Sequence, residues 1–252
     1  MITRDSVVEF LDTYLSVHEI HDGSWNGLQV EGNKSVHRIL FAVDAGIETF
    51  ECAVREKTDM VVVHHGHFWK KVNPSLRGWS KKRLSILLQH NISLYACHLP
   101  LDMHPEVGNN ARLLSVVGAG MTGGFFEYDK ETIGKKGRFG KSRTIDYVVK
   151  KLEKQLNTTC TVLPFGPSAI RTIGAISGGG GYGALEDALK HNLDCYITGD
   201  SVEIYHNARD AGIHVVFAGH HATETLGVKA LAGVVKKQLK VQTLFIDIPT
   251  GL

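Results

Sequence analysis

The sequence predicts an α/β fold built from two related halves, each with a mostly parallel sheet flanked by helices. Short apolar runs alternate with segments of helical periodicity, which is the pattern of parallel strands joined by helices. The plan occurs twice, because Arg38–Gly66 can be laid over Arg171–Gly199 without a gap. A chain of 252 residues, 43% of them hydrophobic, can also bury a substantial core without disulfides.

The first half is expected to open with a helix and a loop before the strands begin. The loop, His18–Gly32, contains the turn signals Asp22-Gly23 and Asn26-Gly27. Strands and helices then alternate. The predicted helices are Ser6–Leu15, Gly46–Lys57 and Lys81–His90, and the predicted strands are Arg38–Asp44, Asp59–His64 and Ile92–Cys97.

The second half repeats this alternation. Its predicted strands are Arg171–Ile176, Asp194–Thr198 and Ile213–Ala218, and its predicted helices are Ala184–His191, Val202–Ala211 and Thr223–Gln238. The glycine-rich segment Gly118–Gly140 lies between the halves and is expected to form short β pieces at a sheet edge, followed by a helix over Ser142–Leu156 and a strand over Thr159–Leu163. We therefore expect the halves to span residues 1–125 and 126–252.

Charge and composition exclude several classes of protein. The formal net charge of +2 is too small to indicate a nucleic-acid or membrane-surface partner, and the basic run from Lys135 to Arg143 is interpreted as a solvated turn. The four cysteines have no metal-finger spacing, which indicates reduced core residues. No secretion signal or run of about 20 apolar residues occurs. We expect a cytoplasmic protein with no membrane contact.

Histidines and carboxylates follow the predicted strands at the points where the strands end. His64 and His65 end one strand, Asp102 comes shortly after another, and His220 and Glu224 follow the last. Functional groups of open parallel sheets gather at these carboxyl ends, so we expect the five side chains to meet between the halves. His220 and Glu224, four residues apart at the start of a helix, can face the same way.

Three imidazoles and two carboxylates form a ligand set that suits borderline divalent metals such as Zn, Fe, Mn, Co or Ni. Five protein ligands exceed the number that one catalytic ion usually takes. The sequence therefore predicts two metal ions that together activate water for hydrolysis. His98 and Asp200 are expected to orient ligand imidazoles through the second ring nitrogen.

The loop Gly178–Gly183 offers a competing interpretation. It matches the G-x-G-x-x-G pattern of dinucleotide sites and has Asp200 about 20 residues further on. A run of glycines matches this pattern by chance, and Asp200 lies at the edge of the predicted metal site. A tight backbone turn is the favoured interpretation, with contact to a phosphate-bearing substrate left open.

The chain resembles the Nif-three-like family, also called GTP cyclohydrolase I type 2 homologues. The resemblance rests on motifs spread over nearly the whole chain: Trp25–Gly32, Val61–Gly66, Leu101-Asp102, Ile197–Asp200 with His206, and Gly219–Glu224. Carried over by position, the family's metal ligands fall on the five residues given above. The resemblance also implies a toroidal homohexamer with metal sites facing an inner cavity. Longer members have an inserted domain, for which this chain has no room.

Three functions are consistent with the sequence. The first is a metal-dependent hydrolase acting on a nucleotide or phosphoester-type small molecule, with metal-activated water as the reactive group. The second is a metal-dependent binding or scaffold ring without turnover. The third is a nucleotide-dependent oxidoreductase that uses the Gly178–Gly183 loop.

Overall fold

The computed structural model describes residues 2–252, which form an α/β fold with two mixed sheets flanked by helices. The chain divides into two compact units. The first unit runs to Leu101 and takes in Val228–Ile248, and the second consists of Asp102–Gly227 and Pro249–Leu252. Helices α4 (Leu99–Met103) and α9 (His220–Leu239) each contain a point where the chain passes from one unit to the other.

The first unit contains a five-stranded sheet in the order β13-β4-β5-β6-β2, in which only the edge strand β2 is antiparallel to its neighbour. A small pair, β1 with β3, lies outside this sheet. The elements are β1 (Ile2–Thr3), α1 (Arg4–Tyr14), β2 (Gly27–Val30), β3 (Ser35–Val36), β4 (Arg38–Asp44), α2 (Ile47–Arg55), β5 (Met60–His65), α3 (Gly78–Gln89), β6 (Ser93–Ala96) and β13 (Gln242–Phe245).

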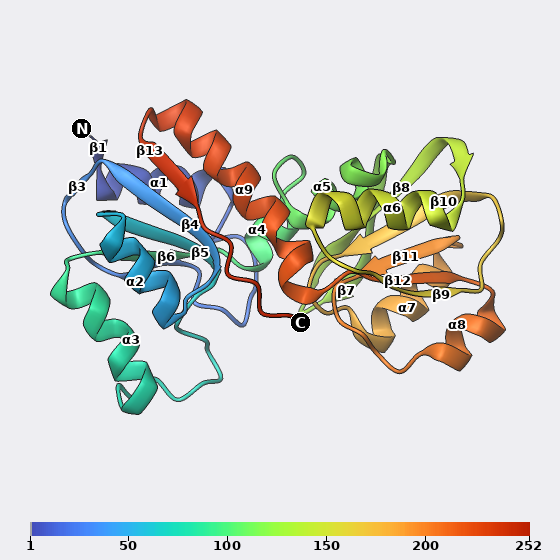
Figure 1. The fold of residues 1–252 in the computed structure, drawn as a ribbon, viewed down its shortest axis with the longest axis horizontal. Coiled ribbons are helices and arrows are strands. Elements are labelled where there is room, and N and C mark those ends of the chain that lie inside the picture. Colours follow the sequence, from blue (N-terminus) through green and yellow to red (C-terminus); the bar gives the residue numbers. More distant parts are fainter. Residues whose placement is uncertain (1) are drawn as a thin grey trace. The chain divides into compact units, whose positions relative to one another are not determined.

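Helices cover both faces of this sheet (Figure 1). On one face, Phe50 of α2 and Leu87 of α3 pack in one cluster with strand residues such as Leu40 and Val61. On the other face, Tyr95 of β6 donates a hydrogen bond of 2.8 Å to a carboxylate of α1. Strands β4, β5 and β6 are therefore buried on both sides, which explains their nearly continuous apolar runs.

The second unit contains a six-stranded sheet in the order β7-β8-β10-β11-β12-β9. Three parallel strands form its centre, and antiparallel strands lie on both sides of them. The elements are α5 (Asn109–Val117), β7 (Gly120–Tyr128), β8 (Glu131–Arg143), α6 (Ile145–Leu156), β9 (Thr161–Pro164), β10 (Ile170–Ile176), α7 (Gly181–Lys190), β11 (Cys195–Thr198), α8 (Tyr205–Ala211) and β12 (His214–Phe217).

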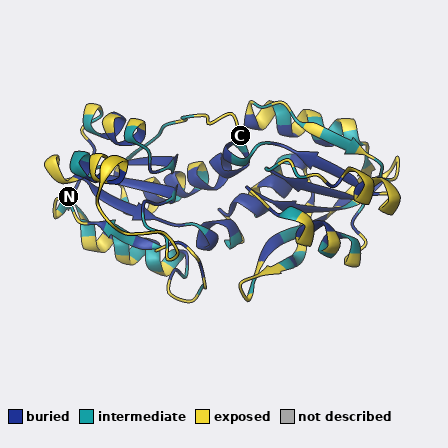
Figure 2. Ribbon diagram, turned by 90° about the horizontal axis from the view of Figure 1, so that it is seen from below, coloured by how far each residue is buried: buried dark blue, intermediate teal, exposed yellow. Residues whose placement is uncertain are grey.

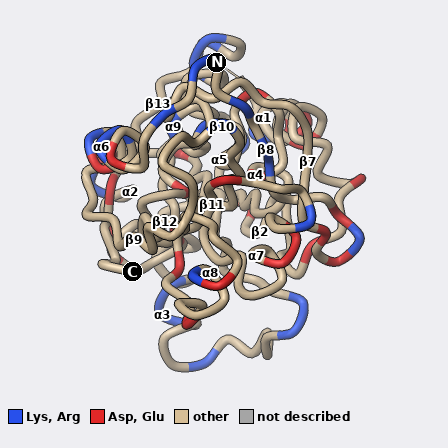
Figure 3. Tube along the Cα trace, turned by 90° about the vertical axis from the view of Figure 1, so that its right-hand side faces the viewer, with Lys and Arg blue, Asp and Glu red and all other residues tan. Residues whose placement is uncertain are grey.

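One face of the second sheet is covered by α5 and α6, whose residues Leu113 and Leu152 pack against Ile173 and Ile197. Figure 1 shows α7 and α8 on the opposite face. In Figure 2 the strands are coloured as buried and the outer faces of the helices as exposed, which is expected when helices cover a buried sheet. Figure 3 shows charges of both signs on α6, in agreement with the balanced composition.

The predicted alternation of strands and helices is confirmed, two expectations need correction, and one strand lies outside the predicted elements. The second sheet is not mostly parallel, because the glycine-rich segment forms the long hairpin β7-β8 and adds two antiparallel pairings. Gly27–Val30 is not loop, because it pairs with β6 as β2. Gln242–Phe245 was not anticipated as a strand, although it pairs in parallel with β4.

The predicted division at residues 125 and 126 stays a prediction. The compact units change over at Leu101 and Asp102, because the hairpin β7-β8 belongs to the second sheet and β13 belongs to the first. Each helix within residues 2–252 is too short or too polar for a bilayer crossing.

Candidate metal centre

Three imidazoles come together in the first unit at the carboxyl ends of β5 and β6. His64 and His65 end β5, and His98 follows β6, which is hydrogen-bonded to β5. The ring centroids are 4.6 Å apart for His64 and His65 and 5.0 Å apart for His64 and His98. One ligand nitrogen from each ring lies within 4.8 Å of the others, so these three residues could hold a metal ion.

The imidazoles of His64 and His65 are each oriented by an oxygen atom. Nδ1 of His64 lies 2.9 Å from the carbonyl oxygen of Cys97, and Nδ1 of His65 lies 2.8 Å from Oδ1 of Asp44. Carbonyl and carboxylate oxygens only accept hydrogen bonds, so Nδ1 is the protonated nitrogen in both rings. Nε2 therefore carries the lone pair that a metal needs.

His98 is oriented in the same way by the buried carboxylate of Asp22, whose Oδ1 lies 2.9 Å from Nδ1. Asp22 also accepts hydrogen bonds from the backbone N–H groups of Ser24 and Leu99 and from the amide of Asn26. Burial by itself raises the pKa of this carboxyl, but the hydrogen bond from His98, its charge and the other donors outweigh burial and lower the pKa to about 2. Asp22 thus stays ionised and fixes the His98 ring.

In the second unit, the first turn of α9 carries an imidazole and a carboxylate that lie close together. Nε2 of His220 lies 3.2 Å from Oε1 of Glu224, and Nδ1 of His220 lies 2.8 Å from Oδ1 of Asp200. The hydrogen bond that His220 donates to Glu224, together with the charges of Glu224 and Asp200, raises the pKa of His220 to about 9 despite burial. The surroundings of Nε2 therefore favour positive charge, which a metal cation would supply.

The turn after β10 packs against His220 and Glu224 and leaves no room for a side chain at Gly178. At Gly178, where φ is +57°, a Cβ atom would lie 2.5 Å from Oε1 of Glu224 and 3.1 Å from Nε2 of His220. The preceding residue, Ser177, donates a hydrogen bond of 2.8 Å from its hydroxyl to Oδ1 of Asp102. Asp102, His220 and Glu224 are thus all held against one Ser177-Gly178 turn.

The residues present fit a divalent metal of the borderline class. Four histidines, His64, His65, His98 and His220, have Nδ1 hydrogen-bonded to an oxygen, so Nε2 is the nitrogen that could bind a metal in each. Because Gly178 has no side chain, it leaves a space beside His220 and Glu224 that a Cβ atom at this position would fill.

The predicted site residues fall in both units. The structure brings His64 and His65 together and adds His98 as a third ligand candidate, beyond the orienting role expected of it. Asp200 lies 2.8 Å from Nδ1 of His220, which is the contact that its predicted orienting role requires. The full set of His64, His65, Asp102, His220 and Glu224, holding two ions, stays a prediction.

Sequence reasoning missed the oxygens that orient the imidazoles of the first unit. Asp44 had a usable signal, because it ends the strand before His65 and is its direct partner in the parallel register of β4 and β5. No sequence signal marks the carbonyl oxygen of Cys97, and the sequence identifies Asp22 only as part of the Asp22-Gly23 turn. Their roles depend on how loops fold back over the strand ends.

The glycines of the Gly178–Gly183 loop are largely explained by close packing. A Cβ at Gly179 would lie 2.5 Å from Oδ2 of Asp200, and one at Gly180 would overlap the hydroxyl of Tyr196. Asp200, which a dinucleotide site would use for a ribose, is hydrogen-bonded to His220. This loop is therefore a tight turn that packs against Asp200, His220 and Glu224.

Over nearly its whole length the chain is similar to one family of proteins. The family model described as Duf34/NIF3 (NGG1p interacting factor 3) matches residues 2–251. A protein of Archaeoglobus fulgidus named GTP cyclohydrolase 1 type 2 homolog is 42% identical over 247 residues, covering 98% of both chains. A protein of Pyrococcus horikoshii with the same name is 44% identical over 251 residues, covering 99% of both chains.

Solved structures show the same similarity. The protein TTHA1606 from Thermus thermophilus is 37% identical, with a TM-score of 0.90 and full coverage of both chains. Protein ybgI, described as of unknown function, is 34% identical, with a TM-score of 0.93 and full coverage of both chains.

Proposed function

We propose that this chain, which belongs to the Duf34/NIF3 family, is a metal-dependent hydrolase acting on a nucleotide or phosphoester-type substrate. The relatives' name, GTP cyclohydrolase 1 type 2 homolog, makes GTP the first nucleotide to assay. The proposal keeps His64, His65, Asp102, His220 and Glu224 as the ligands of two divalent ions.

The observation that carries the proposal is the common orientation of the imidazoles. His64, His65 and His220 each donate Nδ1–H to an oxygen, and ligand histidines in metalloproteins are held in this way. Surface histidines have no reason to share one tautomer. Exclusion of a side chain at Gly178 supports the same assignment, because it keeps open the space beside Nε2 of His220.

A bound divalent cation of this class would lower the pKa of a coordinated water and polarise a substrate oxygen. The protein's own groups prepare the site for that chemistry. Asp44 and Asp200 fix the rings of His65 and His220, and Ser177 holds the carboxylate of Asp102. These contacts restrict the ligands to one arrangement before the substrate arrives.

The test combines metal analysis with an activity screen. Anomalous scattering from crystals counts and identifies the ions, and purified protein is then screened with GTP, other nucleotides and phosphoesters in the presence of Mn or Zn. We expect His65→Ala to lose metal and activity together, while His90→Ala, which removes an exposed histidine at the end of α3, retains both. Activity that survives His65→Ala unchanged contradicts the hydrolase proposal, and metal binding without turnover of any substrate favours a binding or scaffold protein.

The homohexamer implied by the family resemblance is part of the proposal. Light scattering on the eluting peak of a sizing column gives the number of chains per particle. Six chains are expected, and a stable monomer or dimer contradicts the assembly without affecting the metal assignment.

A further inference from the structure

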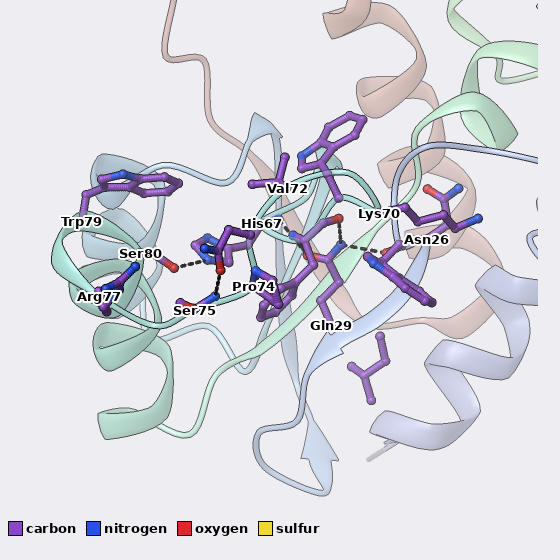
Figure 4. A pocket seen from close by; sticks show the side chains of 15 residues that line it. Asn26, Gln29, His67, Lys70, Val72, Pro74, Ser75, Arg77, Trp79 and Ser80 are labelled. Carbon is purple, nitrogen blue, oxygen red and sulfur yellow. Dashed lines mark hydrogen bonds between the residues drawn. The ribbon is translucent and has the colours of Figure 1, made fainter.

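An open pocket of about 760 Å³ lies in the first unit, outside the set of metal ligands (Figure 4). Its walls come from β2 and the residues before it, from the loop after β5, and from the start of α3. The pocket contains all three tryptophans of the chain, Trp25, Trp69 and Trp79. Its volume lies within the range of small-molecule sites, about 300–1,000 Å³.

Hydrogen bonds join the segments that line the pocket. Oε1 of Gln29 accepts the backbone N–H of His67 at 2.7 Å, and Nε2 of Gln29 donates to the carbonyl of Trp25 at 2.7 Å. Gly66 makes room for this amide, because a Cβ there would lie 2.4 Å from Nε2 of Gln29. On the other side, Nε2 of His67 lies 2.9 Å from the hydroxyl of Ser80, and Figure 4 shows this contact joining the loop to α3.

The lining identifies the chemistry of the ligand. Trp25 is 56% exposed and Trp79 is 61% exposed, so two large aromatic rings are open to solvent at the pocket. Lys70 and Arg77 line the same space, while none of the 15 lining residues is an aspartate or a glutamate. Indole rings stack on flat heteroaromatic rings, and unopposed cations attract phosphate.

The pocket adjoins the three imidazoles of the first unit. The ring of Trp69 lies 6.1 Å from that of His65 and 5.0 Å from that of His98, measured between centroids. Only the side chain of Trp69 therefore needs to lie between a molecule bound in the pocket and the candidate metal ligands.

We propose that this pocket binds a nucleotide, whose base stacks on Trp25 or Trp79 and whose phosphate is held by Lys70 or by Arg77, which line opposite ends of the pocket (Figure 4). That the bound nucleotide is also the substrate rests on the proposed function. That the pocket binds a nucleotide rests only on the residues that line it.

Because every tryptophan of the chain lines the pocket, tryptophan fluorescence reports on its occupancy. The purified full-length protein, treated with a chelator so that metal-bound nucleotide does not contribute, is titrated with the four ribonucleoside monophosphates, their nucleosides and inorganic phosphate. We expect saturable quenching by at least one nucleotide, at lower concentration than its nucleoside or phosphate requires. If no nucleotide gives saturable quenching, the proposal is overturned. Quenching that depends on the protein concentration also overturns it, because such quenching reports self-association.

Variants separate the two recognition elements, with affinities measured by calorimetry and folding checked by circular dichroism. Loss of one stacking ring in Trp25→Ala or Trp79→Ala is expected to weaken nucleotide binding about tenfold, and Trp25→Phe should restore most of it. The double variant Lys70→Ala/Arg77→Ala should weaken nucleotide binding while leaving nucleoside binding unchanged. Lys82→Ala, which removes an exposed cation of α3 that does not line the pocket, is the matched control.

Equal nucleotide affinity in the tryptophan variants and the unmodified protein overturns the stacking assignment. Since binding is measured without metal or turnover, failure here is distinct from failure of the hydrolase proposal. A protein that hydrolyses phosphoesters but binds no nucleotide in the pocket retains the first proposal and loses this one.

Discussion

Replacing Gly178 by alanine should abolish tight metal binding while leaving the fold intact. The added Cβ would lie 2.5 Å from Oε1 of Glu224, whereas an ordinary contact begins at 3.4 Å, so the carboxylate must move by about 0.9 Å. Coordination distances tolerate about 0.2 Å. Glu224 is buried, which limits where its carboxylate can go. We therefore expect the affinity for the most tightly bound divalent ion to fall by at least about 100-fold, beyond the usual effect of disturbing a ligand's supporting contacts.

The chain supplies a matched control for backbone strain. Gly181 has φ of +59°, nearly the same as the +57° of Gly178, but a Cβ there meets nothing within 4 Å. Alanine in this left-handed region costs about 1–2 kcal/mol at either position. Gly178→Ala and Gly181→Ala should therefore lose similar unfolding free energy in the metal-free state, and only Gly178→Ala should lose the metal.

The assay is a competition titration against a chelating dye, paired with urea unfolding of the chelator-treated proteins. Equal metal affinity in the two variants would refute the reasoning, because the steric argument applies to Gly178 alone. Loss of metal from both variants would also refute it, since backbone strain and not the carboxylate would then control binding.

Three further predictions follow from the supporting contacts. Asp200→Ala removes the acceptor for Nδ1–H of His220 and should weaken metal binding about 10–100-fold in the same titration, whereas unchanged affinity would show that the ring is fixed by other contacts. Asn109→Ala removes the buried amide that donates a hydrogen bond to Asp102 and accepts one from a backbone N–H of α9, so the free energy of unfolding in urea should fall by about 2–3 kcal/mol. A decrease near zero would contradict this pairing. The pKa of Asp22 is lowered from 3.8 to about 2, so its contribution of about 2–3 kcal/mol is complete above pH 4 and is lost as pH falls through 2. Metal-free unfolding curves across this range should show a steeper acid loss for the unmodified protein than for Asp22→Asn, and parallel losses would contradict the assignment.

The central strands and their polar ends were predictable because the information is local. Val61, Val62 and Val63 form an apolar run that cannot lie on a surface, and the histidines that follow mark where the strand leaves the sheet. The spacing of His220 and Glu224 likewise predicts a shared helix face, and the structure places these side chains 3.2 Å apart.

The edges of the sheets could not be predicted, because their pairing depends on distant segments. Gln242–Phe245 is a short run of mixed polarity, and only its partner β4, about 200 residues earlier, makes it a strand. Gly27–Val30 begins at the glycine of an Asn-Gly pair that favours a turn, yet it pairs with β6 across a register shift. Residues that orient the imidazoles are hidden for the same reason, since Asp22 meets His98 only through tertiary folding.

The position of β13 has a consequence for synthesis on the ribosome. The first sheet contains β4 from early in the chain, but the strand that covers the β4 edge emerges only after Asp102–Gly227 has been made. Until then β4 presents unsatisfied backbone groups, which are a template for wrong pairing. The second unit, continuous except for its last four residues, can complete its sheet earlier, so the half that is translated first is the half that finishes folding last.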